Sequence, residues 1–250
     1  MLWGIGGDRM KNMIEVNNLY KLYRVGDEIV HALDGVSFTI PQGEFCAIVG
    51  TSGSGKSTLL NMLAGLEKPT KGTVRVAGHQ IEHYNEDQLV AFRRKNVGFI
   101  FQSFHLLGTM NALENVALPL SFRGIPREQR MKVADRMLDL VNLSGHKKHF
   151  PGQMSGGQQQ RVGVARALAV NPRIIFADEP TGNLDSHTSR EVMELMRQVV
   201  YGQKKTLVMV THDDKLASFA DRIFHISDGK IIKVVENSRQ NNEEKGEVVL

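Results

Sequence analysis

One short segment, residues 50–57, constrains the fold of this chain more than any other feature. Its sequence, GTSGSGKS, fits the pattern G-x-x-x-x-G-K-[ST] without a gap. An apolar run of strand length, Phe45–Val49, precedes it, and a run of helix formers, residues 57–66, begins at its last residue. Glycines in such a loop let backbone N–H groups close around an anion at a helix N-terminus. The segment therefore predicts a phosphate-binding loop rather than a merely flexible turn.

The side chains of this loop have distinct predicted roles. The ammonium group of Lys56 is expected to reach the β- and γ-phosphates of a nucleotide, and the hydroxyl group of Ser57 to bind Mg²⁺. The hydroxyl group of Thr58 offers one further phosphate contact. The predicted phosphate-binding residues are Gly50, Thr51, Ser52, Gly53, Ser54, Gly55, Lys56, Ser57 and Thr58.

The composition is that of one large α/β domain, with room for a small inserted subdomain. Of the 250 residues, 41% are hydrophobic and 23% are charged, and the formal net charge is +4. This mild charge argues against a nucleic-acid-binding surface, and no apolar run approaches the length of a membrane-spanning helix. The single cysteine, Cys46, lies among apolar residues and is expected to be a buried core residue in a reducing cytoplasm.

The pattern of apolar residues divides the chain into segments. Residues 1–13 are expected to form a flexible leader, with Met10 and Met13 as alternative start residues, and residues 237–250 a polar, disordered tail. Short β-type runs are expected between residues 14 and 40. Strands alternate with helices over much of the remainder, which predicts a mostly parallel sheet wrapped by helices.

Helical character dominates residues 103–157. Within this stretch, residues 129–141 place several apolar side chains on one broad helix face. These side chains are Val133, Met137, Leu138, Leu140 and Val141.

Two further apolar runs end in polar residues that suit nucleotide chemistry. Residues 174–177 form a run without alternation, typical of a strand covered on both faces, and Asp178 and Glu179 follow it. Ligands of such sheets bind at the carboxyl ends of the strands, so both acids are expected near the phosphate loop. Asp178 can hold Mg²⁺, and Glu179 can orient a water molecule and accept its proton. His212, after residues 207–210, is a candidate sensor of the γ-phosphate.

Residues 155–161, with the sequence SGGQQQR, resemble the signature of the ABC ATPase family. A serine cap, two glycines and the start of a helix also form a second anion site. The family resemblance covers about residues 14–234. It implies a P-loop NTPase (RecA-like) core with a mostly parallel sheet, an N-terminal antiparallel β subdomain and an inserted helical subdomain. The implied boundaries are residues 14–236 for the nucleotide-binding domain and about residues 103–165 for the helical subdomain.

The same resemblance implies a head-to-tail dimer of this chain around two ATP molecules. Each ATP would lie between the phosphate loop of one chain and the signature residues of the other. The implied signature residues are Ser155, Gly156, Gly157 and Gln158, and Met154 stands where the family usually has leucine.

Three more residues match positions of the family. Gln102 follows Phe101 and matches a glutamine that binds Mg²⁺ and senses the membrane partner. Asp185, in the sequence NLD, matches the key acid of a loop that crosses the dimer interface. Tyr23 matches an aromatic residue that stacks on adenine, although an aromatic side chain in a β-rich region is also a common core residue.

Residues 31–34, 93–102 and 112–120 look like the subgroup of macrolide-efflux (MacB), lipoprotein-release and cell-division (FtsE-like) ATPases. The subgroup implies a peripheral protein at the cytoplasmic face of the membrane. It would use ATP and Mg²⁺ to drive an integral membrane subunit, with a solute-binding or extracytoplasmic component as a further candidate partner. A related cassette of an amino-acid-type importer and a soluble, non-transport ABC ATPase are the alternatives. Residues 104–107 either dock the membrane partner or pack internally.

Overall fold

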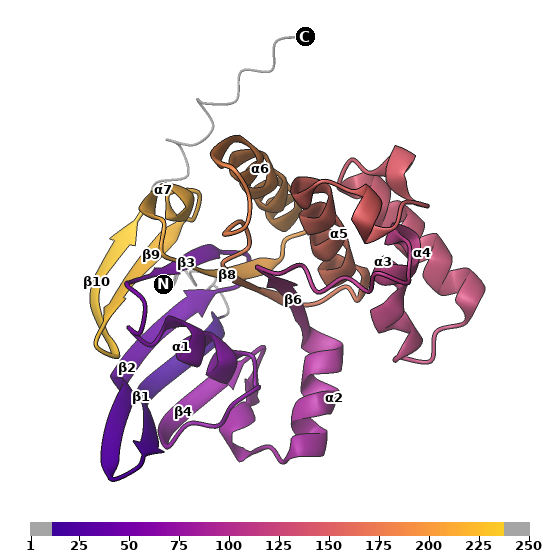
Figure 1. The fold of residues 1–250 in the computed structure, drawn as a ribbon. Helices are drawn as coiled ribbons and strands as arrows, with labels where there is room; N and C mark the ends of the chain where they lie inside the picture. Colours follow the sequence, from indigo (N-terminus) through magenta and orange to yellow (C-terminus); the bar gives the residue numbers. More distant parts are fainter. Residues whose placement is uncertain (1–11, 238–250) are drawn as a thin grey trace, which may run out of the picture.

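The computed structural model describes residues 12–237, which form two β-sheets with helices around them (Figure 1). The larger sheet has six strands in the order β10-β9-β3-β8-β7-β6, and the smaller has four in the order β2-β1-β4-β5. The strands from β9 to β6 run parallel, whereas β10 pairs with β9 in the antiparallel direction. All pairings of the smaller sheet are antiparallel. The predicted α/β fold class is confirmed.

The larger sheet consists of β3 (Phe45–Val49), β6 (Val97–Phe101), β7 (Ile174–Asp178), β8 (Thr206–Thr211), β9 (Arg222–Ser227) and β10 (Lys230–Glu236). The smaller sheet consists of β1 (Asn12–Val25), β2 (Glu28–Pro41), β4 (Lys71–Val76) and β5 (His79–Gln80). The α-helices are α1 (Lys56–Leu63), α2 (Glu86–Asn96), α3 (Ala112–Ser121), α4 (Arg127–Leu140), α5 (Gly156–Ala169), α6 (Ser186–Gly202) and α7 (Asp214–Ala217). The 3-10 turns are η1 (Ile81–His83), η2 (Ser144–His146) and η3 (Pro151–Gln153).

The larger sheet is buried on both faces, which explains why its strands read as continuous apolar runs. In β3, Phe45 and Ala47 pack into a cluster with α3, α4, α5 and α6. Cys46 and Ile48 point to the opposite face and pack with α1 and the smaller sheet. Cys46 is fully buried, as predicted, and burial raises the pKa of its thiol well above the ordinary value.

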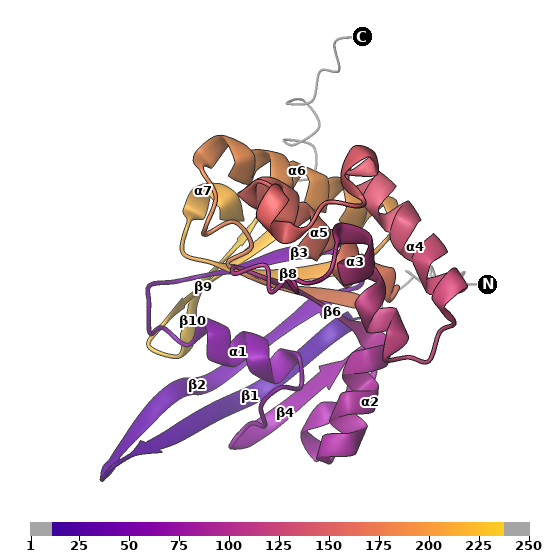
Figure 2. The same ribbon diagram turned by 45° about the vertical axis from the view of Figure 1, so that its right-hand side comes forward.

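The helices divide between the two faces of the larger sheet. Figures 1 and 2 place α5 and α6 on one side, and α1 with the smaller sheet on the other. Helices α3 and α4 pack against α5 and form the helical region that the sequence predicts. On α4, Leu138 is buried, and Val133 and Met137 pack at the edge of the core, but Leu140 is 38% exposed. The apolar face of α4 therefore differs from the predicted one: it includes Ala134 and leaves out Leu140.

The smaller sheet differs from the short runs expected between residues 14 and 40. Strands β1 and β2 form one long hairpin, with pairings from Asn12–Pro41 to Val25–Glu28. Register shifts interrupt this ladder, and Asn18 has a positive φ of 46° beside one of them. Bulges break the alternation of apolar and polar residues, so the sequence pattern shows only fragments of each strand.

The ends of the described chain refine the expected boundaries. Strand β1 begins at Asn12, and Met13 is only 2% exposed, so these two residues belong to the sheet rather than to the leader. Asn237 hydrogen-bonds to the backbone of Asp221 and Ala220. The rest of the expected leader and tail, residues 1–11 and 238–250, lies outside the described residues. Between residues 12 and 237, no helix has the length and apolar character needed to cross a membrane.

Candidate nucleotide site

The predicted phosphate loop connects β3 to α1, and close packing requires glycine at two of its positions, Gly50 and Gly55. A Cβ atom on Gly50 would come within 2.3 Å of the backbone oxygen of Ile226. Gly55 has a φ of 101°, and a Cβ atom there would lie 2.4 Å from the backbone oxygen of Ala32. Only glycine fits both constraints at Gly55. The loop is thus held in shape by the residues around it rather than being a free turn.

Lys56 is the first residue of α1, at the end of this loop. Its side chain folds back so that Nζ donates a hydrogen bond to the backbone oxygen of Thr51 at 2.7 Å. The residue is only 7% exposed, although it is charged. Ser54 is also buried, and its hydroxyl group has no hydrogen-bond partner among the described residues. A buried ammonium group and an unpaired hydroxyl group suit the binding of an anion in the loop.

Asp178 ends β7 next to Lys56, as the parallel sheet predicts. Burial raises the pKa of the Asp178 carboxyl group, the neighbouring Glu179 raises it further, and the ammonium group of Lys56 lowers it. This carboxylate therefore lies partly desolvated beside the phosphate loop. That environment suits a group which a bound cation would stabilise in its charged form.

Glu179 and His212 come together across the carboxyl ends of β7 and β8. The distance between Glu179 Oε1 and His212 Nδ1 is 3.0 Å. The backbone of Glu179 has a positive φ of 44°, and its N–H donates to the oxygen of Val210 at 2.9 Å. Sequence motifs 33 residues apart thus form one carboxylate–imidazole pair.

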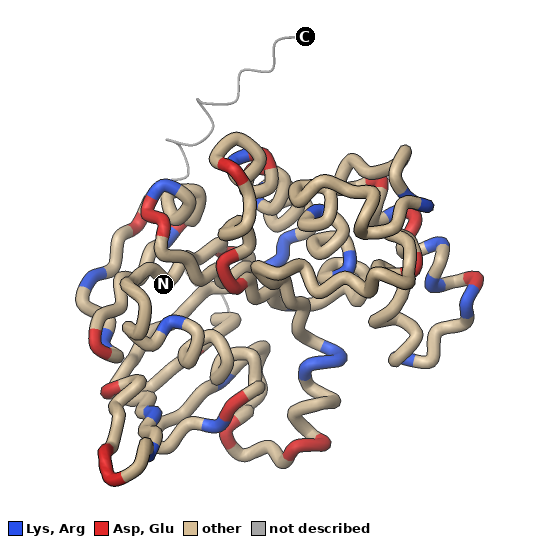
Figure 3. Tube along the Cα trace, in the orientation of Figure 1, with Lys and Arg blue, Asp and Glu red and all other residues tan. Residues whose placement is uncertain are grey.

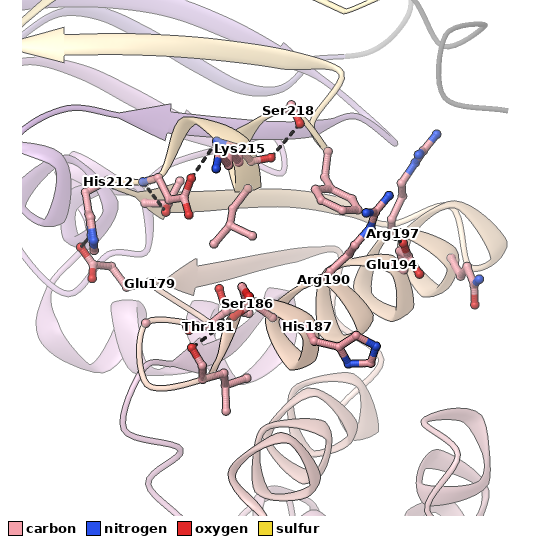
Figure 4. Close-up of a pocket in the computed structure, with 18 of the residues that line it drawn as sticks. Glu179, Thr181, Ser186, His187, Arg190, Glu194, Arg197, His212, Lys215 and Ser218 are labelled. Atoms are coloured by element: carbon pink, nitrogen blue, oxygen red, sulfur yellow. Dashed lines mark hydrogen bonds and ion pairs between the residues drawn. The ribbon is translucent and has the colours of Figure 1, made fainter. Parts of the chain in front are cut away.

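This pair lies at one end of a cavity of about 1130 Å³ between α6 and α7 (Figure 4). The cavity is also lined by three cationic side chains, Arg190 and Arg197 of α6 and Lys215 of α7. These three cations could not be predicted from the sequence, because each occurs on a helix surface without a motif around it.

Gln102, directly after β6, is held by a residue from the segment after the acid pair. Its Nε2 donates to Asn183 Oδ1 at 3.2 Å, and Asn183 Nδ2 donates to the backbone oxygen of Gln102 at 3.1 Å. A Cβ atom on Gly182 would lie 2.7 Å from Gln102 Nε2, so a larger residue at this position would displace the Gln102 amide group. Asn183 belongs to the sequence NLD, in which the family resemblance gave a role to Asp185 alone.

The signature residues form the N-terminus of α5. Ser155 Oγ accepts a hydrogen bond from the backbone N–H of Gln158 at 3.3 Å, and the N–H of Ser155 donates to Gln158 Oε1 at 3.0 Å. Ser155 is thus the expected helix cap, within a capping box. A Cβ atom on Gly157 would lie 2.4 Å from Thr188 Cγ2, and one on Gly156 would lie 3.0 Å from Leu184 Cδ2. Both glycines therefore allow α5 to pack against the start of α6.

Asp185 caps α6 in the same way. Its Oδ1 accepts hydrogen bonds from the backbone N–H groups of His187 and Thr188, and Oδ2 accepts one from Thr188 Oγ1 at 2.6 Å. These bonds, the Thr188 hydroxyl first, lower the pKa of the Asp185 carboxyl group. The residue predicted to act at a dimer interface thus has a local structural function in the single chain.

Tyr23, on β1, is half-buried beside the start of α1. Its hydroxyl group donates to Glu67 Oε1 at 2.6 Å, and the ammonium group of Lys21 lies 5.0 Å from the ring centre. Burial and the Glu67 carboxylate raise the pKa of Tyr23, while a hydrogen bond with the side chain of Thr58 lowers it. The contact with Thr58 places Tyr23 next to the phosphate loop, and its stacking role stays a prediction.

The residues present suit a Mg²⁺ ion that is held together with a nucleotide. Ser57 is exposed on the phosphate loop, and Asp178 ends the strand beside Lys56. Among the described residues, no group of three or more histidine, cysteine, aspartate or glutamate side chains could hold a metal. Mg²⁺ in nucleotide sites typically uses one or two protein ligands together with phosphate oxygens and water, which is the donor set available here.

Comparison with known proteins gives the relatives of this chain. The sequence profile of the family described as "ABC transporter" matches residues 33–182. The chain is 47% identical to the ABC transporter ATP-binding protein MJ1508 of Methanocaldococcus jannaschii, over 89% of this chain and 99% of that protein. It is 48% identical to the macrolide export ATP-binding/permease protein MacB of Chlorobaculum tepidum, over 88% of this chain but only 34% of that protein.

A solved structure of a post-hydrolysis dimer of the ATP-binding cassette MJ0796, bound to ADP and Pi, has the same fold. The TM-score is 0.82 and the identity 43%, over 90% of this chain and 98% of that chain. A second dimeric structure of MJ0796 also has a TM-score of 0.82, with 44% identity and the same coverage. The family match, the full-length relative and the shared fold agree with the expectation of an ABC ATPase. This chain therefore belongs to the ABC transporter family, as an ATP-binding cassette.

Proposed function

We propose that this chain is the ATP-hydrolysing subunit of an ABC transporter and acts as a dimer. The observation that carries the proposal is the contact between Glu179 and His212 at the carboxyl ends of β7 and β8. Lys56 and Asp178 lie at the same edge of the sheet. One edge thus holds a cation for phosphate, a carboxylate for a metal and a carboxylate–imidazole pair for water.

ATP would bind with its phosphates in the loop that contains Lys56. The ammonium group of Lys56 would exchange its hydrogen bond with Thr51 for bonds to the β- and γ-phosphates. Ser57, Asp178 and, after release from Asn183, Gln102 would hold Mg²⁺. When bound there, Mg²⁺ would neutralise charge that develops on the phosphate oxygens. Tyr23, next to Thr58, would contact the adenine ring.

Glu179 is proposed as the residue that orients the attacking water and accepts its proton. The fixed backbone of Glu179 directs the carboxylate toward His212, and His212 is 63% exposed and free to approach a γ-phosphate. In-line attack by this water would break the bond between the γ-phosphorus and the bridging oxygen, yielding ADP and phosphate.

The second half of each ATP site would come from another copy of this chain. Ser155, Gly156, Gly157 and Gln158 present the N-terminus of α5, and Ser155 is exposed. Helix N-termini bind anions, so this surface suits the γ-phosphate bound to a partner's loop. The dimeric state of both MJ0796 structures supports this arrangement.

A groove of about 370 Å³ beside β6 is the proposed docking site for an integral membrane subunit. Phe99, His105 and the exposed Phe122 line it. Phe104 and His105 have positive φ values of 56° and 48°, and the guanidinium group of Arg166 holds both of their backbone oxygens. This strained segment begins two residues after Gln102, so a docked subunit would be coupled to the nucleotide site. Leu106, in contrast, packs against the core.

We propose a transporter of the MacB type, with the chain at the cytoplasmic face of the membrane. The 48% identity to the MacB protein supports this placement. Because the chain spans only about a third of that protein, the membrane subunit would be a separate chain or segment. Lys and Arg residues and Asp and Glu residues are both distributed along the described chain (Figure 3). An amino-acid-type importer remains the alternative within the family.

Co-purification tests this proposal. The variant Glu179→Gln, tagged and trapped with ATP in native membranes, is expected to retain its membrane partner, identified by mass spectrometry. A partner with few transmembrane helices and a large extracytoplasmic domain supports the MacB type, whereas a multi-helix permease with a solute-binding protein supports the importer. Recovery of soluble proteins or ribosomes alone would contradict the transporter function.

A further inference from the structure

The cap of the signature helix has a third member that lies outside the signature. Within the capping box, the amide group of Gln158 accepts a hydrogen bond from the backbone N–H of Ser155 through Oε1. The other atom of the same amide group, Nε2, lies 3.0 Å from Nε2 of His146. His146, Gln158 and Ser155 therefore form a chain of hydrogen bonds that ends at the first residue of the signature.

The chemistry of this chain specifies the state of each member. The N–H of Ser155 is a donor, so the atom of Gln158 that faces it must be the oxygen. The Gln158 NH₂ group must then donate to His146, and His146 Nε2 must accept. A neutral imidazole ring with its proton on Nδ1 meets this requirement. A protonated ring has N–H donors at both nitrogens and cannot accept the bond.

His146 is held in place from two helices. It ends η2, and Lys147, the next residue, has its ammonium group 2.7 Å from Asp135 and from Asp139 of α4. The N–H of Leu113, in α3, donates to the backbone oxygen of Lys147. The imidazole ring of His146 therefore approaches Gln158 from a segment anchored to the helical region, not from a free loop.

We propose that neutral His146 is a positioning residue for the signature. By accepting from Gln158, it keeps the Gln158 oxygen on the Ser155 N–H, and so keeps the start of α5 in the form that meets the nucleotide of a partner chain. Protonation of His146 replaces this hydrogen bond by a repulsion between two donors and weakens ATP-dependent dimerisation. The inference rests on the proposed function of the signature in the dimer.

Few uncompensated charges surround the ring of His146. The His149 ring lies at 4.9 Å from the His146 ring in an edge-to-face arrangement. The Lys147 ammonium group is neutralised by two carboxylates of α4, Lys148 is exposed, and the contact from α5 is the uncharged Gln158. Histidine is the side chain that ordinarily changes charge between about pH 5 and pH 8.

The experiment measures the dissociation constant of the ATP-bound dimer by sedimentation, in a Glu179→Gln background that retains ATP. Four further substitutions are compared with this parent: His146→Ala, His146→Gln, Ser155→Ala and, as a control, His83→Ala. Glutamine can accept a hydrogen bond as neutral histidine does, but it does not titrate. His83 is an exposed histidine of η1, far from the signature in the chain. Nucleotide affinity of the monomer and thermal unfolding are measured for each variant as controls for folding.

At about pH 8, His146→Ala is expected to weaken the dimer about three- to tenfold, the size of one lost hydrogen bond, with monomer ATP affinity unchanged. His146→Gln is expected to stay within about twofold of the parent. At about pH 6 the dimers of the parent and of His83→Ala should be weaker than the dimer of His146→Gln. Any pH dependence that arises from ATP or from groups outside this hydrogen-bonded chain is common to all variants, so this difference reports on His146.

The other outcomes overturn the inference in distinguishable ways. If Ser155→Ala weakens the dimer but His146→Ala does not, the signature acts as proposed and His146 has no part in it. If His146→Ala and His146→Gln weaken the dimer equally, and their dimers show the same pH dependence as that of the parent, His146 only supports the fold. If neither Ser155→Ala nor His146→Ala affects the dimer, the proposed function of the signature fails, and the inference fails with it.

Discussion

At the scale of single residues, the site depends on buried charges and on one backbone conformation that cost free energy in the absence of ligand. Lys56 is charged and almost fully buried, Asp178 is a partly desolvated carboxylate, and Glu179 has a φ that non-glycine residues rarely adopt. Such features are concentrated at functional sites, where a ligand supplies the missing interactions. The contact of Glu179 with His212 is the local reason for assigning water activation to this carboxylate.

The replacement Lys56→Ala is predicted to weaken ATP binding about ten- to hundredfold, because it removes charge-assisted hydrogen bonds to the phosphates. Equilibrium titration with a fluorescent ATP analogue measures the affinity. Lys148→Ala, which removes an exposed lysine of the helical region, serves as the matched control. An unchanged affinity in Lys56→Ala would refute the phosphate assignment.

The replacement Asp178→Asn is predicted to raise the free energy of unfolding near pH 7 while it lowers ATP turnover at least about a hundredfold. Burial raises the pKa of Asp178 in the folded protein, so ionisation at neutral pH opposes folding. The gain should shrink as the pH falls below the ordinary pKa of aspartate, where the carboxyl group is protonated in both states. Urea unfolding near pH 7 and at a pH below the ordinary pKa of aspartate measures this gain in unfolding free energy.

A second aspartate provides the control of opposite sign. The hydrogen bond with Lys147 lowers the pKa of Asp139, so Asp139→Asn should lower the free energy of unfolding near pH 7. That loss should disappear as the pH falls through the lowered pKa. A loss of stability in Asp178→Asn near pH 7 would show that Asp178 contributes to the fold rather than opposing it.

At the scale of elements, the site depends on how helices α5 and α6 begin. Ser155 caps α5, Asp185 caps α6, and Gly157 lets the two helix starts pack through Thr188. Thr188 also donates to Asp185, so the cap of α6 and the packing of α5 share one side chain. The signature and the segment predicted to cross a dimer interface are therefore connected within one chain by the packing and hydrogen bond of Thr188.

The replacement Gly157→Ala is predicted to destabilise the fold by about 1–3 kcal/mol, because the new methyl group would overlap Thr188 Cγ2. Adding Thr188→Ser should recover most of this loss, because serine lacks that methyl group and keeps the hydroxyl group on Asp185. Urea unfolding of the two single variants and the double variant measures the coupling. Additive effects, with no recovery in the double variant, would contradict this packing.

At the scale of the whole molecule, the parallel sheet brings together motifs that are distant in the chain. The phosphate loop, Gln102, the acid pair and His212 follow β3, β6, β7 and β8, whose carboxyl ends meet at one edge. This gathering was predictable, because apolar runs of strand length end in polar residues and alternate with helices. The apolar run Phe45–Val49 was recognised with the bounds that β3 has in the structure.

Other features could not be read from the sequence. The reciprocal bonds between Gln102 and Asn183 span 81 residues, and neither side chain carries a signal for the other. The bulges of β1 and β2 interrupt the alternation on which strand prediction depends. The exposure of Leu140 follows from where α4 packs, which helical periodicity alone does not specify. These features are set by tertiary contacts rather than by local pattern.

The most direct test of the central claim combines hydrolysis with assembly in the variant Glu179→Gln. Phosphate release and sedimentation are measured with ATP and Mg²⁺ for this variant, the unaltered protein and Glu128→Gln, which removes the charge of an exposed glutamate on α4. The account predicts that Glu179→Gln binds ATP, accumulates as a dimer and loses turnover by about 10²- to 10⁴-fold, because it lacks the proton acceptor. Glu128→Gln should resemble the unaltered protein. Full-rate hydrolysis by Glu179→Gln, or a variant that binds ATP but stays monomeric, would contradict the account.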